Sequence, residues 1–377
     1  MNKTARLLST ILVTMTLINP LGAATRDSTG TRVRTLQISL VTPIGSNGFN
    51  SWNITNKFSI NLLAGYAGGV DGVEFSGLGS VLRTRMRGVQ FSGLGSIVLQ
   101  ETTGAQFAGL ANYNAGAMKG FQAAGMANFA IDTMKGLQLA GFFNFTKGEK
   151  VTQVGGFANI NAGNNKGAQI AGFININSGK LTGLQLAGFM NYTRKLKGTQ
   201  LGVINYVDSL EKGVPVGFLS FVKNGYSAFE IGATESLYGV ASFKTGVKQF
   251  YNILSVGGGY RDGLSLFAWG YGAGTVIPVG QRVGISIDGI CYQVNEGEWF
   301  TDRLNLLNKL NISVSFLIAR HLTIYGGLSW NVAVSDITDE YGDPVTPHIA
   351  PWSVFEETFD DHLNVKMYPG ISAGIRL

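Results

Sequence analysis

The chain has 377 residues, of which 45% are hydrophobic, 11% aromatic and only 14% charged; 53 are glycine, and the formal net charge is +6. An average soluble protein carries about 25% charged residues and about 7% glycine, whereas disordered chains are highly charged and poor in aromatic residues. The composition therefore excludes a disordered chain. It also excludes collagen, because glycine does not recur at every third position, and it predicts a glycine-rich all-β protein.

The first 24 residues have the organisation of a secretory signal peptide. Lys3 and Arg6 form a positive start, residues 7–18 are apolar, and Gly22-Ala23-Ala24 supplies the small residues of a cleavage site. The apolar run is too short to span a bilayer as a helix. We therefore expect an exported protein whose mature chain begins near Thr25.

Residues 25–71 are expected to form N-terminal β-strands, with the clearest alternation at 36–41 and 58–63. From Gly72 to residue 226 the chain then repeats one unit, as in GAQFAGLANY from Gly104, GFQAAGMANF from Gly120 and GLQLAGFFNF from Gly136. The unit is G-x-Q-h-[AS]-G-h-x-N-h, where h is apolar, and it recurs every 16 residues with two steps of 15. Internal repeats of this kind define the architecture of a chain.

Within the unit, apolar residues alternate with amides and small residues, which is the period of a strand and not of a helix. Nearly all charges fall in the last six residues of each unit, in turn-like segments such as NAGAMK and NAGNNK. A ten-residue strand is about 33 Å long and, when tilted, crosses the apolar band of about 25 Å of an outer-membrane barrel. We therefore predict an antiparallel transmembrane β-barrel built largely from 16-residue strand-turn units.

The alternative is a β-solenoid in which each repeat forms one coil. It would stack the asparagines at 112, 128, 144, 159, 175, 191 and 205 into a ladder. The equal spacing of the repeats favours this alternative, because bacterial barrels alternate short turns with long loops. The continuous apolar face favours the barrel.

Residues 227–377 keep the alternation but lose the repeat, and we expect them to form strands that close the barrel. The segments are 253–260, 264–274, 282–294, 310–319, 321–334 and 367–377. The last segment puts Ile371, Ala373, Ile375 and Leu377 on one face and runs to the end of the sequence. A C-terminal aromatic residue is usual in such barrels, and Leu377 departs from that pattern.

The repeats resemble a family of bacterial surface-repeat proteins of Bacteroides-like organisms, built from G-x-Q-x-A-G-x-x-N units. The resemblance covers residues 35–260, including FSINLLAGYAGG from Phe58 and FKTGVKQFYNILSVGGGY from Phe243. It implies an exported surface or outer-membrane protein and no defined activity.

Catalytic chemistry is not indicated. The three histidines (His321, His348 and His362) belong to no catalytic motif, the lone Cys291 has no metal-ligand spacing, and the acidic segment 336–343 fits no calcium loop. No basic stripe with interleaved aromatic residues indicates nucleic acid. We expect no enzyme, no cofactor and no metal.

The amide rows are the candidate functional residues. In a barrel they would line the lumen with uncharged donors and acceptors, suited to neutral polar solutes; as structure, they would pair with one another in a filled interior. The candidate lumen-lining residues are Gln106, Asn112, Gln122, Asn128, Gln138, Asn144, Gln169, Asn175, Gln185 and Asn191.

The sequence thus predicts an outer-membrane barrel at the cell surface, structural or a passive pore, with membrane lipid and small neutral solutes as partners. The alternative, from a different class, is an exported solenoid that acts as a surface or adhesin-like interaction protein. A barrel enzyme is the least favoured hypothesis.

Overall fold

The computed structural model describes residues 25–26, 32–337, 347–359 and 362–377, and the predicted leader lies outside them. The prediction of an all-β protein is confirmed, with 76% of residues in strands and 2% in helix. The chain divides into two compact units. The first extends to Val203 and takes in Glu211–Gly213; the second contains Ile204–Leu210 and Val214–Leu377.

The elements of the N-terminal sheet follow in chain order. They are β1 Thr25–Arg26, β2 Arg32–Val41, β3 Ile44–Gly45, the 3-10 helix η1 Gly48–Asn53, β4 Ile54–Ser76, β5 Gly79–Ser92, β6 Gly95–Val98, β7 Glu101–Ala108, β8 Ala111–Asn114, β9 Met118–Ala124, β10 Ala127–Ala130, β11 Met134–Ala140, β12 Phe143–Thr146, β13 Lys150–Gly155, β14 Ala158–Asn161, β15 Asn165–Ala171, β16 Ile174–Ala187, β17 Met190–Leu201, β18 Ile204–Val216 and β19 Leu219–Val222.

The elements of the C-terminal sheet are β20 Tyr226–Thr234, β21 Gly239–Val247, β22 Phe250–Arg261, β23 Leu264–Pro278, β24 Val283–Glu296, β25 Asn305–Ala319, β26 Leu322–Ser335, β27 Phe355–Phe359 and β28 Leu363–Arg376.

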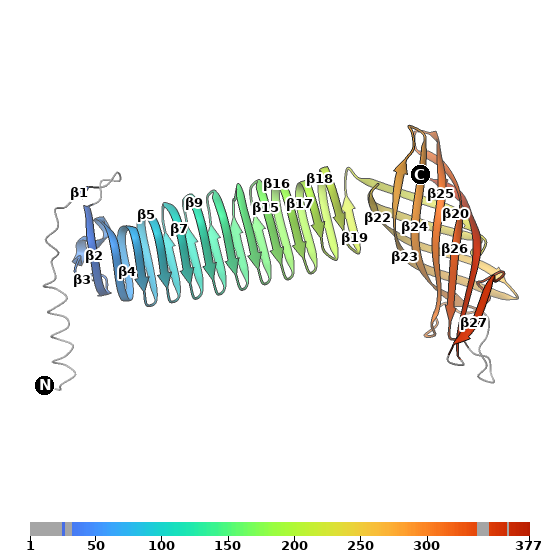
Figure 1. Ribbon diagram of the computed structural model, residues 1–377, viewed down its shortest axis with the longest axis horizontal. Helices are drawn as coiled ribbons and strands as arrows, with labels where there is room; N and C mark the ends of the chain where they lie inside the picture. The colour runs from blue at the N-terminus through green and yellow to red at the C-terminus, as the bar shows by residue number, and fades with distance from the viewer. Residues whose placement is uncertain (1–24, 27–31, 338–346, 360–361) are drawn as a thin grey trace. The chain divides into compact units, whose positions relative to one another are not determined.

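The repeats form a β-solenoid of about ten turns (Figure 1). Strands pair in parallel with the equivalent strand of the next turn, and the register matches identical residues: Gln106 opposes Gln122, and Asn112 opposes Asn128. Each repeat supplies two strands, a longer one such as β9 and a shorter one such as β10. One turn of the solenoid therefore corresponds to one repeat of the sequence.

Glycine occupies two positions of most repeats, and this geometry explains both. Gly120, the first residue of its unit, has a φ of +134°, and a Cβ on it would lie 2.0 Å from the carbonyl oxygen of Gly104. Gly125, the sixth residue, makes the corner between β9 and β10, and its Cβ would lie 2.1 Å from the Gly109 oxygen. Glycine at these positions lets neighbouring coils approach to strand spacing, although Val151 occupies the first position of its own repeat, opposite Gly136.

The prediction that residues 72–226 form barrel strands is wrong, and the stated alternative holds for them. The predicted ten-residue strand is broken by the corner at its sixth and seventh residues, and its neighbours are parallel copies instead of antiparallel hairpin partners. The alternation itself is real, since apolar residues point outward and amides inward. Alternation gives the two faces of a strand but does not reveal which strand lies beside it.

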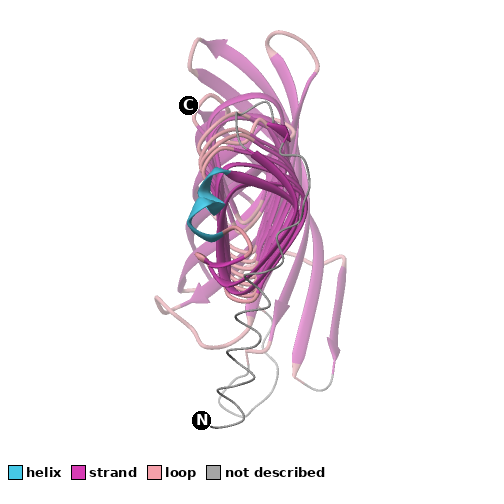
Figure 2. Cartoon of the chain, turned by 90° about the vertical axis from the view of Figure 1, so that its left-hand side faces the viewer, coloured by secondary structure: helices cyan, strands magenta, loops and turns pink. Residues whose placement is uncertain are grey.

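The first turn of the solenoid differs from the repeats. Strand β2 pairs in parallel with β4 and antiparallel with the short β3, and η1 connects β3 to β4 (cyan in Figure 2). The side chain of Asn47 donates to Gln37 and Asn56, which lie in β2 and β4. These contacts satisfy amides that have no preceding coil to pair with.

The C-terminal unit is a closed antiparallel sheet. Strands β20 to β26 and β28 pair in sequence, and β28 also pairs with β20, with Glu230 opposite Arg376. The ring therefore has eight strands, and β27 forms an additional hairpin with β28. Each predicted strand between residues 253 and 377 matches one of β22–β26 and β28, and three of them extend one residue beyond the observed strand, at 282, 321 and 377. A barrel does close, but only strands of this C-terminal unit take part in it.

The last coil of the solenoid packs on this barrel within the second unit. Asn252 of β22 donates to the Gly217 oxygen at 2.8 Å and accepts from the Ser220 amide at 2.9 Å. The ring of Tyr271 stacks on Phe218 with centroids 4.2 Å apart. The segment GVPVGFLSFV from Gly213, a degenerate copy of the repeat, thus forms the connection to the barrel.

Candidate functional site: two polar interiors

The solenoid interior is filled by a continuous glutamine ladder. Each glutamine donates from Nε2 to the Oε1 of the preceding coil, as Gln122 does to Gln106 at 3.1 Å and Gln138 to Gln122 at 2.9 Å. The second Nε2 hydrogen of Gln138 goes to the Phe145 carbonyl on the other strand of its coil. The ladder therefore joins coils along the axis and the two sheets across it.

The asparagine ladder runs in the opposite direction. Asn112 donates from Nδ2 to Oδ1 of Asn128 in the following coil at 2.9 Å, and Asn128 donates to Asn144 at 3.0 Å. Asn128 also donates to the Leu139 carbonyl. The dipoles of the two ladders thus oppose each other, and chains of aligned hydrogen bonds strengthen one another in a low dielectric.

The amides predicted as candidate lumen-lining residues lie in this closed interior. Each has a fractional exposure of zero, so none faces a channel. They are Gln106, Asn112, Gln122, Asn128, Gln138, Asn144, Gln169, Asn175, Gln185 and Asn191. These residues therefore do not line a lumen, as a barrel would require; they hold the coils together.

Glu74 stands at the N-terminal end of the glutamine ladder. It occupies the glutamine position of its repeat, is fully buried, and accepts from Gln90 at 2.7 Å and from Ser80 at 2.6 Å. Asn61 and Ser59 donate to its other oxygen. Desolvation raises the pKa of this carboxyl above its ordinary value, although the four donors oppose that shift.

The barrel interior is polar in a different way, because it contains charges. Lys244 of β21 lies 2.8 Å from Glu230 of β20 and 2.8 Å from Asp288 of β24. Arg376 of β28 pairs with Glu230 and donates to Ser286, and Tyr251 donates to Asp288. Two acids and two bases thus neutralise one another across the lumen.

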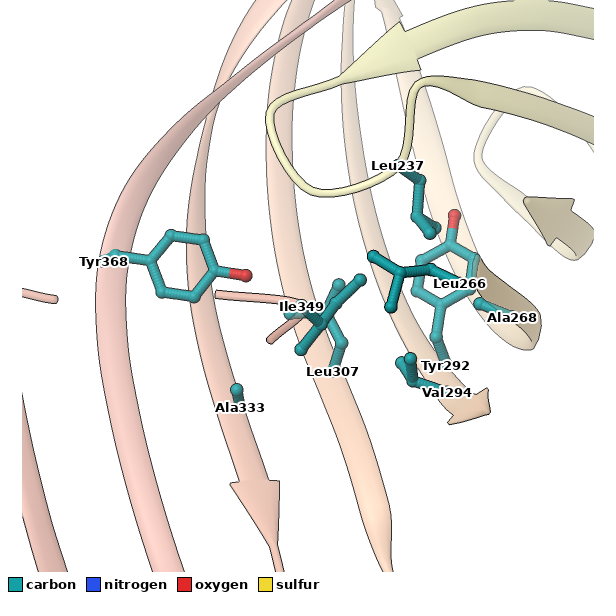
Figure 3. Packing of buried hydrophobic residues seen from close by; sticks show 9 residues of the cluster. All are labelled: Leu237, Leu266, Ala268, Tyr292, Val294, Leu307, Ala333, Ile349 and Tyr368. Carbon is teal, nitrogen blue, oxygen red and sulfur yellow. The ribbon is translucent and has the colours of Figure 1, made fainter. Parts of the chain in front are cut away.

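A second pair lies nearer the other end of the barrel. Glu235, in the loop between β20 and β21, lies 2.9 Å from Lys309 of β25 and accepts from the Ile371 amide at 2.8 Å. The same loop inserts Leu237 into an apolar cluster with Ile349 and Tyr368 (Figure 3). Side chains and two loops therefore fill the interior.

The outer face of the barrel is apolar. Within the eight strands of the ring, six charged residues point inward and are at most 8% exposed, and the other two, Arg261 and Glu296, end their strands. The inward residues are Glu230, Lys244, Asp288, Lys309, Lys366 and Arg376. On β25 alone, Leu310, Ile312, Val314, Phe316 and Ile318 are each about half exposed. The polarity is inverted relative to a water-soluble domain.

The solenoid also exposes apolar rows, but beside charged ones. Phe75, Phe91 and Phe107 stack face to face at about 5 Å, and Phe157, Phe173 and Phe189 do the same in later coils. An apolar groove of about 920 Å³ runs across successive coils, floored by the sixth-position glycines. The turns at the other end of each coil carry the charges.

Residues suited to catalysis or metal binding do not gather elsewhere in the described part of the chain. No group of three or more metal-ligating side chains is present among the described residues. The imidazole Nδ1 of His348 lies 3.1 Å from a carboxylate oxygen of exposed Asp262, and Cys291 is exposed on β24. Most of the acidic segment 336–343 lies outside the described residues. No helix in the described ranges is long and apolar enough to cross a membrane.

Comparisons with known proteins provide no relative: no family model, no curated protein and no solved structure matches this chain.

The inward charges of the barrel were missed from the sequence. Their signal is an isolated charge in an apolar alternating segment, as with Lys244 in GVASFKTGV and Asp288 in VGISIDGICYQVNE. Each lies on the face opposite the apolar residues. In the sequence, each of these charges looks like an interruption of a strand. The opposite charges come together only because the ring of strands closes.

Proposed function

We propose that this is an exported, non-catalytic interaction protein of the outer membrane, in which the eight-stranded barrel is the anchor and the β-solenoid is the interaction module. The observation that carries the proposal is the inverted polarity of the barrel. A half-exposed apolar belt with all its charges inside is unfavourable in water and favourable in lipid hydrocarbon. Closure also pairs the backbone groups of every strand, as a bilayer requires.

The barrel serves as an anchor and not as a pore. Eight strands enclose a space just wide enough for side chains. That space is crossed by the Lys244–Asp288 ion pair and by the hydrogen bond between Ser372 and Asn311 at 2.8 Å. This departs from the passive pore that the sequence suggested, and it leaves neutral solutes without a route.

Loop lengths support one orientation of the anchor. Connections 248–249, 279–282 and 320–321 lie at the end where β20 begins and β28 ends. The opposite end carries the two-residue turn 262–263, the connection 235–238 and the two longest connections, 297–304 and 336–354. Bacterial barrels keep short turns on the periplasmic side and long loops outside. We therefore propose that the long loops face the cell surface and that the solenoid enters the barrel from the periplasmic side.

The solenoid supports the interaction part of the proposal. Rigid solenoids present extended surfaces made of equivalent residues, and binding to such surfaces is the usual use of the architecture. Here the exposed aromatic rows and the apolar groove are of the kind that marks interaction sites.

Carbonate extraction of isolated outer membranes tests the anchor. We expect the full chain to remain in the pellet, and release into the supernatant would contradict the proposal. Protease treatment of whole cells tests the orientation: cleavage within 297–304 with an intact solenoid is expected, and cleavage confined to the solenoid turns would reverse it.

A further inference from the structure

One row of the solenoid surface carries cations in register. The residue before the first position of the repeat is Asp71, Arg87, Thr103, Lys119, Lys135, Lys150, Lys166, Thr182, Lys197 or Lys212 in successive coils. Strand pairing places Lys119 beside Lys135 and Lys135 beside Lys150, and Thr182 beside both Lys166 and Lys197. Seven cations, at positions 87, 119, 135, 150, 166, 197 and 212, thus occupy one register position along the solenoid and are here called the basic ladder.

The basic ladder is exposed and largely uncompensated. All seven cations are exposed. Lys135 pairs with Glu149 at 2.9 Å, Glu149 also attracts Lys166, and Asp71 lies opposite Arg87. The other four cations, Lys119, Lys150, Lys197 and Lys212, have no ion-pair partner among the described residues. Coils are about 4.8 Å apart, so the four lysines from Lys119 to Lys166 repel one another at close range.

This arrangement is unfavourable for the fold alone. Like charges directly opposite each other on neighbouring strands destabilise a sheet, and threonine at positions 103 and 182 shows that the coil accepts a neutral residue there. Residues that destabilise the fold, and for which no other contact compensates, are expected at functional sites. If these lysines served only to keep the surface in contact with water, the same charge would not need to recur at one register position.

We propose that the basic ladder binds a linear anionic glycan, with one carboxylate or sulfate per sugar set against successive coils. The rise of a coil is comparable to the length of one sugar in an extended chain, so the repeats of protein and polymer match. Phe121 and Leu137 occupy the outward position two residues after Lys119 and Lys135, where they offer apolar faces to the sugar rings. The proposal rests on the solenoid being the interaction module but does not depend on membrane insertion.

The test uses purified full-length protein in detergent micelles and polygalacturonate as the probe, with neutral dextran as a blank. Wild type is expected to bind polygalacturonate, increasingly tightly with chain length, and to release it with salt. The variant K119Q/K135Q/K150Q/K166Q should bind at least tenfold more weakly. Its slope of log affinity against log salt should fall by about three to four, about one for each cation removed.

Two matched variants control for net charge and for folding. K57Q/K147Q/R194Q/K248Q removes four exposed cations off the ladder and should bind within twofold of wild type, whereas K119R/K135R/K150R/K166R keeps the charges and should bind normally. Equal loss in the off-ladder variant, or no loss in the ladder variant, would overturn the proposal. Tighter ladder-dependent binding to duplex DNA or to anionic lipid vesicles than to polygalacturonate would overturn the glycan assignment. Carbonate extraction of the ladder variant should be unchanged, which separates failure of this inference from failure of the anchor.

Discussion

The two units of this protein have the same external polarity but opposite internal chemistry. Both point apolar side chains outward from their strands and polar ones inward. The solenoid fills its interior with neutral amides that repeat in register, whereas the barrel fills its interior with a few charges that neutralise one another across the ring. The difference follows from strand direction.

Parallel, in-register stacking brings each residue beside a copy of itself. An amide can be both donor and acceptor to its own copy, so Gln122 pairs with Gln106 and Gln138 without help from another residue type. A buried charge repeated in the same way would repel itself. Antiparallel closure instead brings different residues together, so Lys244 can meet Asp288 from a strand 44 residues away.

The largest loss of stability is expected from removing one member of the ion-pair network inside the barrel. Lys244→Met leaves Glu230 and Asp288 buried beside each other with only Arg376 to compensate, and breaking a buried ion pair costs about 3–5 kcal/mol. Heat-dependent mobility in SDS gels should show the folded barrel melting at a much lower temperature. Lys248→Met, in an exposed turn of the same barrel, should leave the transition unchanged, and a similar shift in both variants would contradict the assigned network.

Removing one glutamine from the ladder of the solenoid is expected to cost less stability. Gln138→Leu leaves one Nε2 hydrogen of Gln153 and the Oε1 of Gln122 without partners, while Gln153 keeps its hydrogen bond to the Ile160 carbonyl. Each unpaired buried group costs about 1–3 kcal/mol, and the added apolar side chain offsets part of this. Because unfolding of two units has no single free energy, hydrogen exchange resolved by peptide is the suitable measurement. Faster exchange is expected in β9 to β13. Protection there equal to wild type would mean that the ladder contributes nothing to stability.

We expect the outward faces of the two units to meet different solvents, lipid around the barrel and water around the solenoid. Ile312→Arg puts a charge in the apolar belt, where it costs about 2–4 kcal/mol near the bilayer midplane, and should reduce the amount of assembled protein in membranes. Val279→Arg, at a turn of the barrel, should cost no more than about 1 kcal/mol. Phe107→Arg on the solenoid should be tolerated, while Gln106→Arg should not. If Phe107→Arg blocks membrane assembly as Ile312→Arg does, the solenoid surface is also in lipid.

The comparison shows how much of this structure is predictable from sequence. The strands, the alternation and the 16-residue period could be derived, because they follow from residues close together in the chain. The pairing of Gly104 with Gly120 instead of with a hairpin partner could not, since outward apolar and inward polar residues satisfy both a barrel and a solenoid. The positive φ of Gly120 and its contact with the Gly104 oxygen decide between them, and both need a neighbouring coil to exist.

The smallest expected effect concerns Glu74, the one acid in the glutamine position of a described coil, which gives the neutral interior of the solenoid a group that can ionise. Its folded-state pKa is raised above the ordinary value of 4.5 by burial. Protons are therefore held more tightly in the folded state than in the unfolded one. The stabilisation is complete below pH 4.5 and is lost as the pH rises from 4.5 through the folded-state pKa. Glu74→Gln removes this dependence while keeping an acceptor for Gln90.

Hydrogen exchange of β4 and β5 in the two proteins, each measured from pH 4 to pH 8, tests this expectation. Relative to the variant, wild type should lose protection progressively as the pH rises, with little difference at pH 4. The same comparison in β22 to β25 provides the internal control, because the barrel is identical in both proteins. A constant difference at all pH values would mean that Glu74 stays in one protonation state throughout, and that the four donors around it, not its burial, set its pKa.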